Sequence, residues 1–231
     1  MIEKVIIFDA STIISLAMNG LYEEISLLKS IFKGRFIITK EVKYEIIDRP
    51  LTIKKFELEA LKLQKLLQDG VFELPSSLGV SDSEVSKEAQ SILDLANKTF
   101  YGDGREMRIV DLGETSCLAL SKILNGKGIS SVLAVDERTM RMLVEKPDNL
   151  DKLLSKKLNT KIKANRDYFK YFKGFNFIRS SELVYVLYKK GLTKLKGPMV
   201  LDALLYAVKF KGCSISGDEI REIKSLGEKG I

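Results

Sequence analysis

Four acidic residues are placed so that they could share one site. They are Asp9, Glu45, Glu114 and Asp136. Carboxylates that gather in one place raise each other's pKa, and a hard divalent cation removes that repulsion. Mg²⁺ binds such oxygen ligands, and a bound metal can orient water, lower the pKa of that water and hold the oxygens of a phosphodiester. The four acids therefore predict a magnesium site with hydrolytic chemistry.

The chain contains no histidine, which narrows the chemistry further. A Ser–His–Asp triad, histidine-ligated zinc and histidine acid–base catalysis are excluded. Cys117 and Cys213 are far apart in the sequence and lack the spacing of a zinc site or a disulfide framework. An enzyme of this composition must use carboxylates, lysines, hydroxyls or a bound metal, and a reducing cytoplasm is its expected location.

The elements that must position the acids follow from the apolar pattern. Strands are predicted at residues 5–8, 35–39, 71–75, 131–135 and 175–179. Helices are predicted from caps at Ser11 and Thr12 to about residue 31, and at 40–47, 54–67, 81–100, 112–128, 137–144, 180–191, 198–212 and 216–227, with a loop at 101–106. This alternation predicts an α/β fold with a mostly parallel central sheet flanked by helices.

The carboxyl ends of parallel strands meet at one edge of a sheet, where ligands bind. Asp9 directly follows the first predicted strand, and Asp136 directly follows the strand at 131–135. Both acids should therefore lie at that edge.

Positive charge is concentrated in one segment of the chain. The formal net charge is +7. The cations of residues 151–173 are Lys152, Lys156, Lys157, Lys161, Lys163, Arg166, Lys170 and Lys173. Two acids, Asp151 and Asp167, oppose them. With 45% hydrophobic residues and no long uncharged apolar stretch, we expect neither a signal peptide nor a membrane-spanning helix.

The same segment contains YFKYFKGF at residues 168–175. Aromatic side chains among cations suit stacking on single-stranded bases together with phosphate contacts. Alternatively, the segment is an amphipathic helical insertion whose aromatic side chains enter the core while its lysines face solvent. We favour the second interpretation for the aromatic residues and keep both for the cations.

Several acids have competing interpretations. Asp9 alone could be a helix N-cap, Glu41 competes with Glu45, and Asp111 competes with Glu114 as the acid that begins the helix at 112–128. Asp202 and Asp218 are a second candidate pair of later acids. We place them outside the site because KGCSIS (residues 211–216) is a poorer strand than SVLAV (residues 131–135).

Four stretches in order give the chain a family resemblance. They are VIIFDASTIISLA, ITKEVKYEI, DLGETSCLALSKIL and SVLAVDERTMRML. Together they resemble the PIN-domain metal-dependent ribonucleases over roughly residues 4–146, in the archaeal and bacterial branch with a Gly-Glu helix start. LVYVLYKKGL and VLDALLYAVKFKGCSIS, nearer the C-terminal end, are also similar to that branch.

The resemblance implies a three-layer PIN-like fold and an acidic pocket that binds one or two Mg²⁺ or Mn²⁺ ions and cleaves single-stranded RNA with metal-activated water. Asp9, Glu45, Glu114 and Asp136 match the family's first to fourth acids, and Ser11 matches a hydroxyl position after the first acid. One departure concerns Ala134 and Val135, which precede Asp136 where many members carry Thr or Ser.

The leading hypothesis is therefore an endoribonuclease with a core at 1–146, a basic insertion at 147–174, and a strand and helices at 175–231 that complete the same domain. The expected RNA-binding side chains are Ser11, Lys156, Lys157, Lys161, Lys163, Arg166 and Lys170. One alternative is an inactive PIN-like protein that binds RNA or acts as a scaffold. Another is a toxin whose partner is a protein antitoxin, for which an exposed apolar groove would be the structural sign. By resemblance, a homodimer is also expected.

Overall fold

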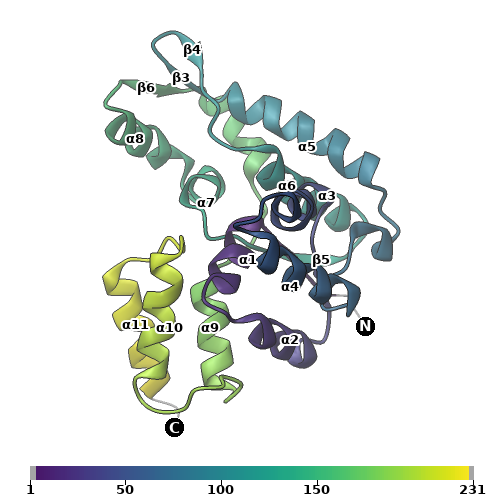
Figure 1. Cartoon of the computed structure of the whole chain (residues 1–231). Coiled ribbons are helices and arrows are strands. Elements are labelled where there is room, and N and C mark those ends of the chain that lie inside the picture. Colours follow the sequence, from purple (N-terminus) through teal and green to yellow (C-terminus); the bar gives the residue numbers. More distant parts are fainter. Residues whose placement is uncertain (1–3, 229–231) are drawn as a thin grey trace.

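A parallel sheet of four strands forms the centre of the computed structural model, which describes residues 4–228 (Figure 1). The strands are β1 (Lys4–Phe8), β2 (Arg35–Ile37), β5 (Ser130–Ala134) and β7 (Phe177–Ile178), in the order β2-β1-β5-β7. β1 is buried along Val5–Phe8, as expected for a strand covered on both faces. The fold is thus mixed α/β, as the sequence predicts.

Strand register brings the ends of β1 and β5 together. Phe8 is the pairing partner of Ala134, and the N–H of Asp9 donates to the carbonyl of Ala134 at 3.0 Å. Asp9 and Asp136 therefore lie at the same carboxyl edge, which confirms the prediction for these two positions.

Helices flank this sheet. They are α1 (Ala10–Ala17), α2 (Tyr22–Ile31), α3 (Lys40–Lys43), α4 (Glu57–Gln68), α5 (Asp82–Asn97), α6 (Leu112–Gly126), α7 (Arg138–Glu145), α8 (Pro147–Leu158), α9 (Ser180–Lys189), α10 (Val200–Phe210) and α11 (Gly217–Glu228). α6 packs on β1 and β5 and is covered in turn by α5, while α9, α10 and α11 lie together at the C-terminal side (Figure 1). Shorter turns are η1 (Tyr44–Asp48), η2 (Pro50–Thr52), η3 (Pro75–Leu78) and η4 (Arg166–Phe172).

Three predictions about the elements are wrong. The single helix expected from Ser11 to residue 31 is divided into α1 and α2, because Gly20 adopts a left-handed conformation (φ +73°). Residues 71–75 do not form a strand, although Glu73 makes an isolated parallel bridge with Ile37. Residues 101–106 are not a simple loop but belong to a hairpin of β3 (Phe100–Gly102) and β4 (Arg105–Glu106).

The basic segment is anchored to this hairpin. β6 (Ile162–Ala164) pairs antiparallel with β3 and completes a second, three-stranded sheet. Phe169 and Phe172 are buried, and the ring of Phe169 lies 6.1 Å from that of Phe100. Core packing therefore accounts for these two aromatic residues, as we favoured, whereas Tyr171 is 53% exposed.

Across residues 4–228, no helix has both the length and the apolar character needed to cross a bilayer.

Candidate functional site

Asp9 forms the buried centre of the site. Its side chain is the N-cap of α1 and accepts the N–H of Ser11 at 3.0 Å, so Asp9, rather than Ser11 or Thr12, caps this helix. The hydroxyl of Ser11 donates to the same carboxylate and accepts the N–H of Asp136 at 3.1 Å. One hydroxyl thus connects the residues that end β1 and β5.

Asp111 and Glu114 begin α6 together. The carboxylate of Asp111 accepts the N–H of Glu114 at 2.9 Å, and the carboxylate of Glu114 accepts the N–H of Asp111 at 2.9 Å. This reciprocal pair is a capping box, which the spacing D-x-x-E could have indicated. Asp111 and Glu114, which the sequence analysis treats as alternatives, therefore both belong to the start of α6.

Glu45 reaches this helix start from η1, a single π-helical turn that follows α3. A Cβ atom built on Gly113 would lie 3.1 Å from Oε2 of Glu45 and 3.3 Å from Oδ1 of Asp111. The missing side chain of Gly113 therefore lets the two carboxylates approach the same point. Glu41 accepts a hydrogen bond from Ser86 of α5 at 2.5 Å and lines the same cavity as Glu45, whereas the carboxylate that reaches Gly113 is that of Glu45.

Burial and mutual repulsion raise the pKa of three of these acids. Burial, followed by the charge of Asp111, raises the pKa of Asp9 to about 6. Partial desolvation of the otherwise exposed Glu45, followed by the charges of Asp111 and Asp9, raises the pKa of this acid to about 7. Burial, Asp9 and Asp111 raise the pKa of Glu114 to about 9. At neutral pH the cluster thus retains protons that a bound cation would displace.

Asp136 has a different environment from the other three predicted acids. It is fully buried, and its carboxylate accepts the N–H of Ser180 at 2.7 Å and the hydroxyl of Ser180 at 2.6 Å. These bonds direct the carboxylate to the start of α9. The structure therefore brings together Asp9, Glu45, Glu114 and Asp111, and connects Asp136 to them through its backbone and Ser11.

The other acids considered from the sequence are engaged elsewhere. Asp202 forms an ion pair with Lys224 at 2.5 Å, and Asp218 forms one with Arg221. Glu137 caps α7 by accepting the N–H of Met140 at 2.9 Å, and its charge contributes to the raised pKa of Glu114.

A divalent cation suits the donor set of the cluster. All the ligands offered are carboxylate or hydroxyl oxygens, which Mg²⁺ prefers. No Lys or Arg of residues 4–228 forms an ion pair with Asp9, Glu45 or Glu114. Within the same part of the chain, no three acids or cysteines are arranged as a ready-made metal site. The carboxylates face a common region without converging on one point.

A cavity of about 470 Å³ opens beside Glu45 and Asp111. Lys40, Arg49 and Arg108 also line it, so cations stand near the exposed side of the acidic cluster. The charge of Arg49 counteracts part of the rise in the pKa of Glu45. These three cations were not singled out from the sequence: Lys40 begins α3 and Arg49 follows η1, and packing brings them beside Arg108, which precedes α6.

The predicted RNA-binding cations are exposed but dispersed. They are Lys156, Lys157, Lys161, Lys163, Arg166 and Lys170. Lys170 lines a second cavity with Lys122 and Gly126, at the opposite end of α6 from Glu114. Arg166 forms an ion pair with Asp148 at 3.5 Å. The structure therefore does not gather these cations around the carboxylates.

Neither the protein-family models, nor the curated proteins, nor the solved structures gave a match to this chain, so its function must be argued from the site itself.

Proposed function

We propose that the chain is a PIN-type metal-dependent endoribonuclease that hydrolyses single-stranded RNA with one or two Mg²⁺ or Mn²⁺ ions. The observation that carries this proposal is the cluster of Asp9, Glu45 and Glu114 beside Asp111. Several acids with raised pKa values in one place are typical of catalytic and metal-binding sites. The absence of histidine and the family resemblance agree with metal-assisted hydrolysis.

Asp9, Glu45 and Glu114 would hold the metal. A divalent ion, when bound, supplies an activated water and neutralises charge on phosphoryl oxygens. Ser11 orients the carboxylate of Asp9, and the N–H of Asp111 orients that of Glu114. Glu45 is exposed on η1 and can adjust to the ion. The carboxylate of Asp136 holds the start of α9 by accepting the N–H of Ser180, and the backbone N–H of Asp136 donates to the hydroxyl of Ser11.

Calorimetric titration of Mn²⁺ into the wild type and Asp9→Asn tests the metal site. Asparagine is as good an N-cap as aspartate, so the variant should keep α1 while losing the charge. We expect binding in the wild type, loss of binding in Asp9→Asn, and wild-type behaviour in Asp69→Asn, an exposed acid at the end of α4. Equal binding by all three proteins would refute the site.

Cleavage of single-stranded RNA tests the activity. We expect Mn²⁺-dependent cleavage by the wild type and by Asp69→Asn, and none by Asp9→Asn. If Asp9→Asn binds RNA normally and the wild type does not cleave it, the inactive RNA-binding alternative gains support instead. Full activity of Asp9→Asn would contradict the proposed mechanism.

A second proposal, regulation by an antitoxin-like protein, is favoured by one observation. A largely apolar groove of about 580 Å³ borders Glu45 between α1, η1, α4 and the end of α10. Phe210 is 78% exposed there, and Met18 and Phe56 are also exposed. Such a groove is the sign expected of a partner-regulated toxin. Growth arrest on expression of the wild type but not of Asp9→Asn would support this proposal, and normal growth with both would contradict it.

A further inference from the structure

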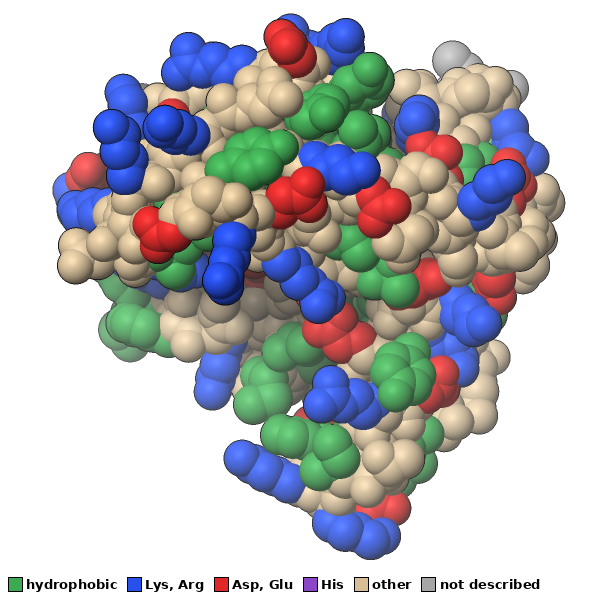
Figure 2. Space-filling model, turned by 90° about the horizontal axis from the view of Figure 1, so that it is seen from above, with side chains coloured by type: hydrophobic (Ala, Val, Ile, Leu, Met, Phe, Trp, Pro, Cys, Tyr) green, Lys and Arg blue, Asp and Glu red, His purple; other side chains and the backbone are tan. Residues whose placement is uncertain are grey.

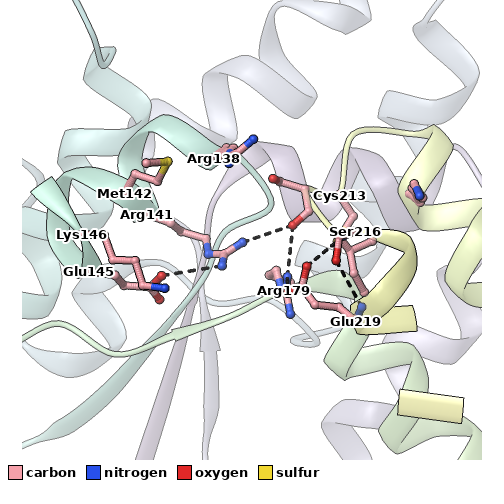
Figure 3. A pocket seen from close by; sticks show the side chains of 12 residues that line it. Arg138, Arg141, Met142, Glu145, Lys146, Arg179, Cys213, Ser216 and Glu219 are labelled. Carbon is pink, nitrogen blue, oxygen red and sulfur yellow. Dashed lines mark hydrogen bonds and ion pairs between the residues drawn. The ribbon is translucent and has the colours of Figure 1, made fainter. Parts of the chain in front are cut away.

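We propose that a cavity between α7 and the start of α11 binds a phosphate group. The cavity measures about 570 Å³ and lies at the carboxyl edge of the sheet (Figure 3). Five cations line it: Arg138, Arg141, Lys146, Arg179 and Lys209. Two acids, Glu145 and Glu219, oppose them. Figure 2 shows that the surface of the molecule is hollowed, with Lys and Arg side chains at the rim of the hollow.

Arg179 forms part of the wall rather than the ligand site. Its guanidinium donates to Glu182, to Glu219 at 2.7 Å and to the carbonyl of Ser214 at 3.1 Å. Two carboxylates therefore neutralise it, and its side chain is 12% exposed. These bonds fix the loop before α11 against the start of α9, so the cavity has a defined shape.

Arg141 is partly buried and lacks a full set of partners. Its side chain is 16% exposed, and its two polar contacts are long: 3.5 Å to the carbonyl of Ser214 and 3.7 Å to the carboxylate of Glu145 (Figure 3). Its Nε atom is buried and has no hydrogen-bond partner among the described residues. A buried donor without a partner is costly, and an anion in the cavity would supply the missing acceptor.

The remaining cations are available to a ligand. Within residues 4–228, Arg138, Lys146 and Lys209 form no ion pair, and Lys209 lies 5.6 Å from the ring of Tyr206. The cavity thus has an uncompensated positive charge that attracts an anion.

A tetrahedral oxyanion such as phosphate suits this lining. Guanidinium groups bind phosphate oxygens in pairs, and cations from α7, from the junction of α7 and α8, and from α10 can surround a tetrahedral group with several charged oxygens. No aromatic side chain is among the described residues that line the cavity, so it offers charge rather than a stacking surface for a base.

The cavity adjoins the carboxylate site through Asp136. The N–H of Ser214 donates to the carbonyl of Asp136 at 3.1 Å, and Arg138 follows Asp136 by two residues. If the phosphate belongs to an RNA strand, that strand passes the carboxylates, and this part of the inference rests on the proposed function. Phosphate binding itself does not.

The test is calorimetric titration of inorganic phosphate, and separately of a short single-stranded oligoribonucleotide in EDTA, into the wild type. Arg138→Gln and Lys146→Gln are the variants, because both side chains are exposed and neither holds the fold together. Lys87→Gln, on the exposed face of α5, is the control with the same charge change. We expect about tenfold weaker phosphate binding in both variants and none of this loss in Lys87→Gln.

The two titrations distinguish the sources of the phosphate. Parallel losses of RNA and phosphate binding would assign the cavity to a nucleic-acid strand, and loss of phosphate binding alone would assign it to a free phosphate compound. Absence of saturable phosphate binding by the wild type, or equal binding by all variants, would overturn the inference. EDTA prevents metal-dependent cleavage, so these titrations measure binding independently of activity. A wild type that binds phosphate but does not cleave RNA in the separate assay with Mn²⁺ would refute the proposed function alone.

Discussion

Oε2 of Glu45 lies 3.1 Å from the point that a Cβ atom on Gly113 would occupy. The acid comes from η1 and the glycine from the first turn of α6, which are far apart in the sequence. Glycine at this position allows a carboxylate of one element to rest on the backbone of another. The contact brings Glu45 to the start of α6, beside Asp111.

Gly113→Ala should weaken the metal site without weakening the fold. The new methyl group would lie 3.1 Å from Oε2 of Glu45, whose exposed carboxylate can move, and 3.3 Å from Oδ1 of Asp111, which needs to shift by only a few tenths of an ångström. Alanine favours a helix over glycine by about 1 kcal/mol. We expect an unchanged or higher melting temperature and Mn²⁺ affinity reduced several-fold, measured by thermal unfolding and calorimetry. A lower melting temperature with unchanged affinity would show that Glu45 takes no part.

Without metal, stability should fall as the pH rises through the range in which the clustered acids lose their protons. Glu114 has an ordinary pKa of 4.5 and a pKa of about 9 in the folded chain, so between these values the folded state binds more protons than the unfolded state. The free energy of unfolding therefore decreases with rising pH. Thermal unfolding in EDTA from pH 6 to about 9 measures this decline.

Glu114→Gln should flatten that decline, because glutamine keeps an acceptor for the N–H of Asp111 but carries no titrating proton. Glu88→Gln, which removes a half-buried acid of α5 that pairs with Lys122, is the control for loss of one carboxylate. Identical pH profiles for the wild type and Glu114→Gln would contradict the raised pKa.

Ser11→Ala should reduce both stability and metal affinity. The hydroxyl bonds to Asp9 and accepts the N–H of Asp136, so its removal leaves a buried N–H without a partner at a cost of about 1–3 kcal/mol. The hydrogen bond from Ser11 lowers the pKa of Asp9, so its removal raises that pKa further. A metal then displaces the proton of Asp9 less readily. Urea denaturation and Mn²⁺ titration measure the two effects, and Ser11→Thr, which restores a hydroxyl, should recover both.

Two substitutions of Asp136 separate a structural role from metal binding. Asp136→Ala removes both acceptors for Ser180 and should lower the free energy of unfolding by about 1–3 kcal/mol. Asp136→Asn keeps one carbonyl acceptor, and the hydroxyl of Ser180 can accept from the new amide, so its stability should stay near that of the wild type. Because the carboxylate faces α9, we expect Asp136→Asn to retain Mn²⁺ binding. Loss of binding as complete as in Asp9→Asn would show that Asp136 turns toward the metal.

The sequence by itself determined the strands that carry the site. The buried runs before Asp9 and Asp136 have no other stable placement than a central sheet, and parallel pairing then brings their ends to one edge. The helix after Asp111 was likewise evident, since apolar spacing and an acidic start specify it locally. Asp111 and Glu114 were weighed as alternatives for the start of that helix, although the spacing D-x-x-E is that of a capping box, which uses both.

Tertiary structure decided what each side chain faces. Ser180, 44 residues later in the chain, donates both its N–H and its hydroxyl to the carboxylate of Asp136. Glu45 reaches Gly113 only once α3, which precedes η1, packs on α6. The hairpin of β3 and β4 turns at Asp103 and Gly104, a dipeptide typical of such turns, so the sequence could have indicated it. Its pairing with β6, some 60 residues later in the chain, depends on tertiary structure. Local sequence patterns predict helices, strands and buried positions. Hydrogen bonds between distant segments depend on how the whole chain packs.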